Sequence, residues 1–179
     1  GAKEIMGFLK KVSRLVASEN LPVCWTTPKP LNFPVQMMCY KKESKRVKTK
    51  MGDSIIKLSI QSDTDEIDKR KTAQSICPNL IHSLDASCLM LAVIKAKDKG
   101  VTNFSLIHDS FGCVAPDVHK LSEAIREAFC EVYEQDVLTN WAMEMKQMLS
   151  EKNAKKFPHI PERGNLDLSL VKQSIFFCV

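Results

Sequence analysis

The sequence predicts an α+β fold in which amphipathic helices alternate with antiparallel hairpins. Three observations lead to this prediction. Apolar residues recur at helical spacing over residues 3–18, 79–99 and 117–152. Short alternating runs flank turn residues in two other segments, 35–62 and 101–115. The chain has 179 residues, 44% of them apolar, so it can bury the core of one globular domain.

The first elements are a helix and an irregular segment. Residues 3–18 place apolar side chains at intervals of three and four with cations between them, which predicts an amphipathic helix. Residues 20–34 contain four prolines, which cannot donate backbone hydrogen bonds. We therefore expect an extended, irregular stretch around Trp25.

Residues 35–62 predict a projecting basic hairpin, with its reversal at Gly52 and Asp53. Residues 41–50 hold six cations and one anion, a net charge of +5 that equals the charge of the whole chain. The other 169 residues carry 20 cations and 20 anions. Charge concentrated in this way indicates contact with a polyanion. A solvated loop explains the charge alone equally well.

The second half predicts helix, hairpin and helix. Residues 63–77 form a polar connector that becomes helical, and Pro78 opens a helix over 79–99 that ends at Gly100. Two short strands within Val101–Ala115 meet at a polar interruption. One long helix covers 117–152, and an irregular tail follows it. The expected architecture is a small antiparallel sheet covered by the helices of residues 79–99 and 117–152.

Several classes of protein are excluded by spacing. The seven cysteines never lie two to four residues apart, so we expect reduced thiols rather than a zinc ribbon. The six glycines form no phosphate-binding loop. No apolar run reaches the roughly 20 residues of a membrane span, so we expect no membrane contact.

Two polar groups are candidate sites. Asp109 lies between His108 and Ser110 at the second hairpin's reversal, where a carboxylate could bind a metal ion or satisfy its own backbone. The backbone alternative is the commoner one. His82 and Asp85 share a helix face, which is either a ligand surface or an ordinary boundary face. A hydrolase that uses these two residues with Asp109 is a weaker third possibility.

Together these motifs resemble the C-terminal part of the single-subunit RNA polymerases of the phage and mitochondrial type. The resemblance rests mainly on Pro78–Ser87 and on Ile107–Gly112. Further stretches resemble the family's sequences in the same order along the chain. They are Ala17–Asn20, Trp25–Pro28, Phe33–Val35, Asp68–Lys71, Arg163–Leu168 and a final aromatic pair. The resemblance therefore covers almost the whole chain.

The resemblance implies roles for individual residues of a palm-type catalytic hairpin, residues 101–115. Asp109 would be the catalytic carboxylate and a ligand of the two Mg²⁺ ions that activate the RNA 3′-hydroxyl and stabilise the leaving pyrophosphate. His108 would lie beside the growing RNA end. His82 would contact the minor-groove side of the terminal base pair.

The resemblance also assigns the basic hairpin, residues 41–61, to promoter recognition in the DNA major groove. There cations contact phosphates and position the loop, while base-edge contacts select sequence. The nucleic-acid-binding residues implied here are Lys41, Lys42, Lys45, Arg46, Lys48 and Lys50.

The family's second metal-binding carboxylate and its nucleotide-handling helix lie upstream of the residues in this sequence. We therefore expect a C-terminal portion, residues 1–179, without the upstream domains and inactive alone. Its partners would be template and promoter DNA, RNA product, nucleoside triphosphates and the upstream part of the polymerase. The alternative function is a stand-alone nucleic-acid-binding module that uses the basic hairpin. Gly112 favours a phage enzyme, and hence the cytoplasm of a bacterial host, with the mitochondrion as the alternative location.

Overall fold

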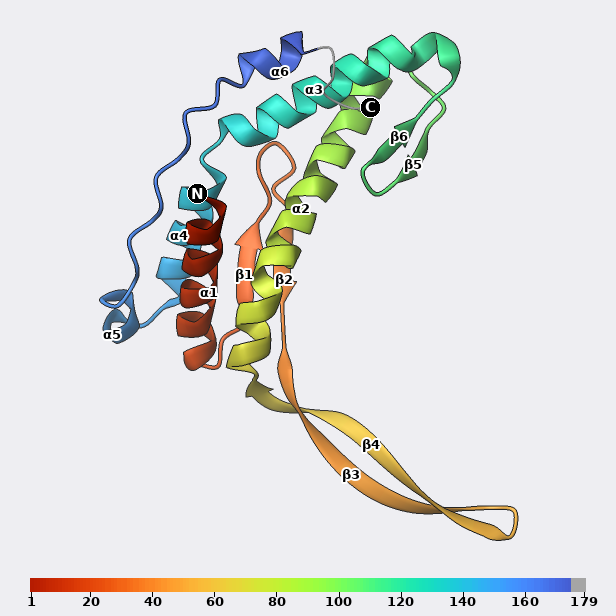
Figure 1. Ribbon diagram of the computed structural model, residues 1–179, viewed down its shortest axis with the longest axis vertical. Coiled ribbons are helices and arrows are strands. Elements are labelled where there is room, and N and C mark those ends of the chain that lie inside the picture. Colours follow the sequence, from red (N-terminus) through yellow and green to blue (C-terminus); the bar gives the residue numbers. More distant parts are fainter. Residues whose placement is uncertain (175–179) are drawn as a thin grey trace.

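The computed structural model describes residues 1–174, and it shows a helical body from which one long hairpin projects (Figure 1). The main helices are α1 (Ala2–Ser18), α2 (Lys69–Asp98), α3 (Val118–Glu134) and α4 (Val137–Met148). Short helices are η1 (Ala115–Asp117), α5 (Glu151–Ala154) and α6 (Ser169–Gln173). The strands are β1 (Val23–Thr26), β2 (Pro34–Met37), β3 (Tyr40–Met51), β4 (Ser54–Ile67), β5 (Ser105–Ile107) and β6 (Ser110–Gly112). The last aromatic pair lies outside the described residues.

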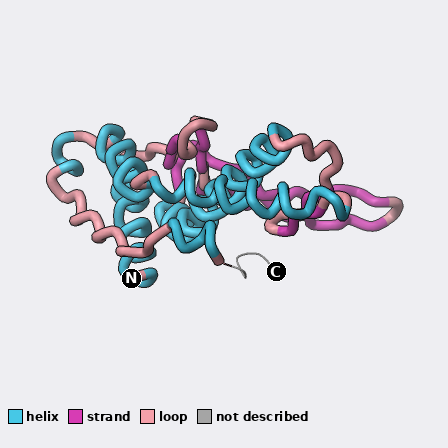
Figure 2. Tube along the Cα trace, turned by 90° about the horizontal axis from the view of Figure 1, so that it is seen from above, coloured by secondary structure: helices cyan, strands magenta, loops and turns pink. Residues whose placement is uncertain are grey.

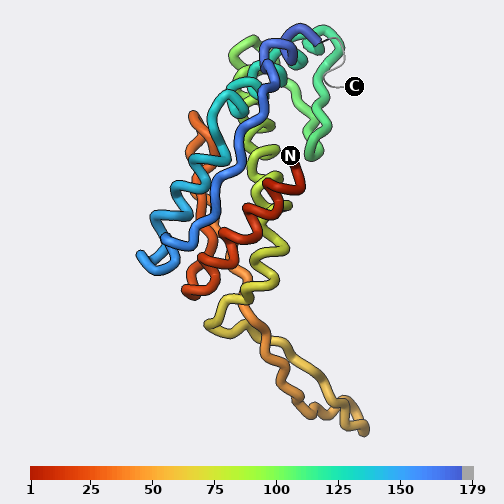
Figure 3. Tube along the Cα trace, turned by 60° about the vertical axis from the view of Figure 1, so that its left-hand side comes forward, coloured from red at the N-terminus to blue at the C-terminus, as the bar shows by residue number. Residues whose placement is uncertain are grey.

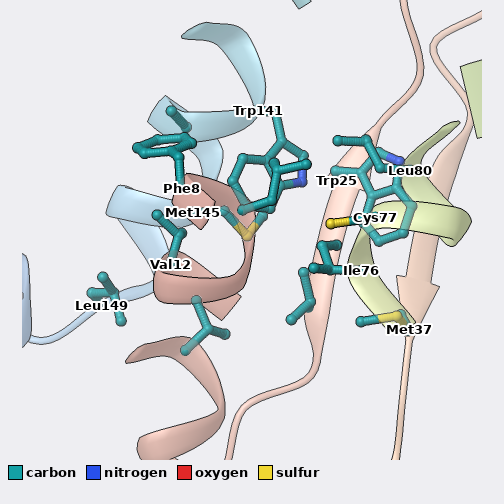
Figure 4. Close-up of a cluster of buried hydrophobic side chains, with 14 of the residues drawn as sticks. Phe8, Val12, Trp25, Met37, Ile76, Cys77, Leu80, Trp141, Met145 and Leu149 are labelled. Atoms are coloured by element: carbon teal, nitrogen blue, oxygen red, sulfur yellow. The ribbon is translucent and has the colours of Figure 1, made fainter. Parts of the chain in front are cut away.

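The largest core cluster joins α1, the β1–β2 hairpin, the first half of α2, and α4 (Figure 4). Phe8 packs edge-on against both Trp141 and Phe157, at ring-centroid distances of 6.3 and 6.0 Å. Two smaller clusters lie between the second half of α2 and α3. Helix α2 therefore connects the two ends of the body.

Helix α2 begins ten residues earlier than the sequence predicts, and Pro78 lies inside it rather than at its start. The carboxylate of Asp68 accepts hydrogen bonds from the backbone amides of Arg70 and Lys71, which caps the helix there. Proline inside a helix costs about 3 kcal/mol. Burial of Ile76 and other apolar side chains of this half offsets that cost, and the Asn79 side chain donates to the carbonyl of Ser75.

The long helix predicted over 117–152 is wrong, because the chain breaks between α3 and α4. Gln135 is extended at the break, and its side-chain amide both accepts from and donates to the backbone of Lys29 in the β1–β2 loop. Asp136 then caps α4 through the amide of Thr139. Tertiary hydrogen bonds thus override the helical periodicity.

Two predictions about the strands are also wrong. Within residues 1–174 the strands form three separate two-stranded antiparallel sheets rather than one small sheet. Trp25 lies in strand β1, which pairs with β2, although the prolines predicted an irregular segment. Pro34 is tolerated because it is the first residue of its strand.

By length and composition α2 could cross a membrane, because an 18-residue window of this helix has a mean hydropathy of 1.4. Of the residues in that window, 33% are buried inside the structure. The expectation that the sequence holds no such segment is therefore wrong on composition. Core helices of water-soluble proteins pass the same test, and α2 packs against α1 and α3.

Candidate active-site hairpin and nucleic-acid interface

The β5–β6 hairpin carries His108 and Asp109 as the two residues of its turn. Ile107 pairs with Ser110, and Gly112 lies opposite Ser105, where an added Cβ would approach the serine Cβ to 3.3 Å. His108 has a φ of 54°, which is uncommon for a residue other than glycine. Such backbone conformations cluster at functional sites.

Phe111 fastens this short hairpin to the body. Its ring packs against both small core clusters, beside Leu91 on α2 and Leu121 on α3. Figures 1 and 3 show the hairpin running back alongside α2 from the end of the body. The turn residues are left exposed while the strand behind them is held.

Ion pairs hold α2 and α3 together beside the hairpin. The Lys99 ammonium lies 3.1 Å from carboxylate oxygens of Glu123 and of Glu127, and Lys95 lies 2.6 Å from Glu131. The hydrogen bonds that the Lys99 ammonium donates to the Glu127 and Glu123 carboxylates raise the pKa of Lys99 above its usual value. These ion pairs therefore link the end of α2 to α3.

His82, Asp85 and Ala86 are exposed on one face of α2, and Leu80 and Leu91 are buried on the other. Sequence reasoning missed the residue that fixes this part of the helix. The buried indole of Trp25 donates to the Ser83 hydroxyl at 3.0 Å, and that hydroxyl donates to the carbonyl of Leu80. Only the apolar context of Trp25 in the sequence could have signalled this contact.

Cys88 lies on α2 near Asp85 and packs on the cluster that also receives Phe111. Burial, with a smaller contribution from Asp85, raises the pKa of its thiol to about 11. Burial also raises the pKa of Tyr133 to about 12, and Cys88 and Asp85 add to the effect. Both groups are neutral near pH 7, which makes Cys88 an unreactive thiol. The six cysteines of the described residues are unpaired, as expected.

The Asp109 carboxylate suits one ligand position of a magnesium site. Its side chain is exposed, and among residues 1–174 no hydrogen bond or ion pair to it is seen. Magnesium is commonly held by one or two carboxylates plus substrate phosphates. Within that same part of the chain no group of three His, Cys, Asp or Glu side chains could hold a metal ion. A metal site at Asp109 would therefore need further ligands from outside these residues.

A hydrolase site is not assembled from His82, Asp85 and Asp109. All three side chains are exposed. Three pockets in the described part of the chain are lined by other residues. Within residues 1–174 these three side chains line none of those three pockets.

The β3–β4 hairpin is anchored only at its base within the described structure. Asn20 donates from its side chain to the carbonyl of Asp65 and accepts from the amide of Ile67. Lys41 lies 2.5 Å from the Glu66 carboxylate, which raises the pKa of Lys41 and lowers that of Glu66. Beyond this base the hairpin extends away from the helices (Figure 2). The strands run past both ends of the predicted 41–61 segment.

The strand register places the predicted cations on two different faces of the hairpin. Lys41 belongs to the base, and Lys45 lies on the opposite face from the remaining cations. The other four share one face with Lys57, which pairs with Lys48 and which sequence reasoning did not single out. This basic face consists of Lys42, Arg46, Lys48, Lys50 and Lys57. The same side also carries Ser44, Asp63 opposite Lys42, and Ile55 opposite Lys50. The five exposed cations on this side can contact phosphates of a nucleic acid.

Comparisons with known proteins agree with the motifs. The family model described as DNA-dependent RNA polymerase matches residues 1–156. The chain is 39% identical over 176 residues to DNA-directed RNA polymerase 2, chloroplastic/mitochondrial, of Arabidopsis thaliana. It is 35% identical over 176 residues to DNA-directed RNA polymerase 1, mitochondrial, of Nicotiana sylvestris. These matches cover 98% of this chain.

The chain spans a small part of these relatives. It covers 16% of the Arabidopsis protein and 17% of the Nicotiana sylvestris protein. DNA-directed RNA polymerase 2A of Nicotiana tabacum, 35% identical, is covered to 50%. Most of the length of the first two relatives therefore has no counterpart in these 179 residues.

Proposed function

The chain belongs to the single-subunit, phage-type DNA-dependent RNA polymerases, and from this premise we propose that it is the C-terminal portion of such an enzyme. With the rest of the polymerase it would carry out template-dependent nucleotidyl transfer. The observation that carries the proposal is the exposed Asp109 carboxylate in the strained turn of a hairpin held against α2 and α3. Alone, the chain would be inactive, because its described residues offer one carboxylate to a site that needs more oxygen ligands.

Magnesium at this hairpin would activate the attacking hydroxyl and stabilise the charge that develops on the leaving phosphates. Asp109 would contribute one oxygen ligand. His108, next to it in the turn, and His82, on the exposed face of α2, would contact the RNA end and its base pair. Phe111 and Trp25 would keep the two supporting elements in position.

Primer extension on an RNA–DNA scaffold with Mg²⁺ and four nucleotides tests the proposal. We define the chimeric polymerase as the Arabidopsis relative with its matched residues replaced by this chain. The chimeric polymerase should extend the primer, and the 179-residue chain alone should not. Asp109→Asn in the chimera should lower the rate by about a hundredfold or more, as expected when a group that stabilises transition-state charge is lost.

A matched control comes from the other hairpin. Asp53 is also an exposed aspartate in a hairpin turn, so Asp53→Asn makes the same chemical change away from the proposed site. This variant should extend the promoter-free scaffold at the unaltered rate. Near wild-type extension by the Asp109→Asn chimera would overturn the metal-ligand assignment.

The second candidate function is a nucleic-acid-binding module, which the basic face of the β3–β4 hairpin favours. Here DNA affinity would depend on Lys48 and Arg46, and Asp109 would be irrelevant. This function would be favoured if neither the chimera nor the chain extended the primer while both still bound DNA.

An apolar groove of about 440 Å³ suits contact with the upstream part of the polymerase. It lies between the start of α1, with Ile5 and Met6, and Ile81 on α2, with Arg163 at one side. Ile81 and Met6 are 54% and 44% exposed. Most of each organellar relative lies outside the matched residues, and that part would cover this groove.

The location would be an organelle rather than the cytoplasm. The relatives are named as mitochondrial or chloroplastic enzymes, so they support the organellar alternative and not a bacterial cytoplasm. Fractionation of the source cells, with the polymerase detected in purified organelles or in the cytosol, distinguishes the two.

A further inference from the structure

The β3–β4 hairpin has a second face with opposite chemistry. In an antiparallel pair, directly opposed residues point to the same side and successive residues alternate between sides. The register pairs Val47 with Leu58 and Thr49 with Ile56, on the side away from Lys48 and Lys57. We define this apolar face as Val47, Thr49, Met51, Ile56, Leu58 and Ile60; Lys45, which pairs with Ile60, lies on the same side at the end nearer the base. The hairpin is therefore amphipathic, with the basic face on its other side.

The apolar face is open to solvent in the described structure. Leu58 is 48% exposed and Ile60 is 53% exposed. Among the described elements, the contacts of β3 and β4 are mainly with each other, and Figure 1 shows the ribbon leaving the body as a twisted pair. A contiguous exposed apolar patch on a protein marks an interaction site.

Nucleic acid is a poor occupant for this face. Phosphates are bound by cations and by N–H or O–H donors, and base edges are read mainly by hydrogen bonds. The central pairs of the apolar face offer aliphatic side chains and a single hydroxyl, that of Thr49. Charge complementarity directs nucleic acid to the basic face and a protein surface to the apolar face.

A second copy of the chain is also a poor occupant because the face is small. Stable protein–protein interfaces use about 20–30 residues on each side, whereas the apolar face has six. An apolar contact of this size is sufficient within one polypeptide, since covalent linkage gives an effective concentration of about millimolar. The relatives supply such a polypeptide, because about five-sixths of the Arabidopsis polymerase lies outside the matched residues, given the 16% covered.

We propose that the apolar face of the β3–β4 hairpin docks on a protein surface in the remainder of the same polymerase chain, while the basic face points away towards DNA. This inference rests on the proposed function. Docking fixes the ribbon beyond its base, where Asn20 and the Lys41–Glu66 ion pair hold it. A pre-positioned basic face loses less conformational entropy when it binds DNA.

Cysteine accessibility on the two faces tests the proposal. Leu58→Cys and Lys57→Cys place thiols on adjacent residues of β4 that point to opposite faces. Alkylation rates at each position are measured by peptide mass spectrometry in the isolated chain and in the chimeric polymerase without DNA. We expect similar, rapid alkylation at both positions in the isolated chain. In the chimera, alkylation at position 58 should slow at least tenfold while position 57 stays rapid, and promoter DNA should then slow position 57.

The outcomes separate this inference from the function on which it rests. A chimera that extends primers but alkylates rapidly at position 58 would overturn the docking proposal and leave the polymerase assignment intact. A chimera that neither extends primers nor protects position 58 would overturn both. A third outcome is slow alkylation at position 58 in the isolated chain, with a rate that falls as protein concentration rises and with a dimer in light scattering. That outcome would identify a second copy as the occupant and would also overturn the proposal.

Discussion

The two hairpins that carry the candidate functional residues share a design and differ in what holds them. Both reverse through two residues and expose an aspartate in the turn, Asp53 in one and Asp109 in the other. The β5–β6 hairpin has three residues in each strand and is fastened to two core clusters by Phe111. The β3–β4 hairpin has strands of 12 and 14 residues and leaves the body after its base.

This difference separates a fixed site from a site that needs a partner. A two-stranded hairpin is marginal in water unless it packs against something else. The short hairpin meets that condition within the chain, so its turn residues are held where chemistry requires accuracy. The long hairpin leaves both faces exposed along its length, so its position depends on what covers them.

The largest expected contrast is in stability. Phe111→Ala should lower the free energy of unfolding of the chain by about 3 kcal/mol, because it removes a ring from two clusters at once. Leu58→Ala on the long hairpin should change it by less than about 0.5 kcal/mol, as for an exposed substitution. Urea unfolding followed by Trp fluorescence measures both. Equal losses in the two variants would show that the long hairpin is coupled to the core.

The second contrast concerns the thiol packed near Phe111. Cys88 has a pKa of about 11, against an ordinary 9.0, so at pH 8 its thiolate fraction should be about a hundredfold below that of an exposed cysteine. The folded pKa lies above the unfolded one, so the neutral thiol contributes stability fully below about pH 9. That contribution is lost as the pH rises through about 11.

Alkylation rates of Cys88 between pH 7 and 10 check this second prediction. Phe111→Ala should increase the rate at pH 8, because Phe111 packs on the same cluster as Cys88. Leu58→Ala is the matched control and should leave the rate unchanged. Rapid alkylation of Cys88 at pH 8 in the unaltered chain would contradict the burial that raises its pKa.

The third contrast lies within the long hairpin. Replacing Lys48 and Lys57 by serine removes two cations of the basic face, and should weaken DNA binding about tenfold and reduce the slope of log K against log salt by about 2. Lys45→Ser, on the opposite face, should have little effect. Fluorescence anisotropy with duplex DNA at several salt concentrations measures the slopes. A larger effect from Lys45 would show that the register does not decide which face meets DNA.

Much of this organisation is visible in the sequence, and the misses in the helix boundaries have a common cause. Helical spacing located α1, and the turn residues located the Gly52–Asp53 and His108–Asp109 reversals. The start of α2 and the break after α3 were missed because distant contacts decide them, such as the hydrogen bonds between Gln135 and Lys29. Local patterns carry no information about such pairs.

For the candidate site, the motifs selected Asp109 and His82, whose roles stay predictions. The two faces of the long hairpin were missed for a different reason. A charge count over residues 41–50 mixes both faces, and only the register separates Lys45 from Lys48. Strand pairing is therefore needed before charge can be assigned to a surface.

The smallest expected effect comes from the long hairpin's turn. Gly52 has a φ of +61° and open space around it, so Gly52→Ala introduces no clash but should cost the turn about 1 kcal/mol of local stability. Because β3 and β4 pack mainly on each other among the described elements, global unfolding should shift by less than about 0.3 kcal/mol. Hydrogen exchange should be faster for amides beside the turn and unchanged in α2. In the chimeric polymerase the same variant should slow promoter-dependent initiation more than primer extension. The reason is that the turn lies at the end of the proposed DNA-binding face and takes no part in the proposed chemistry at Asp109.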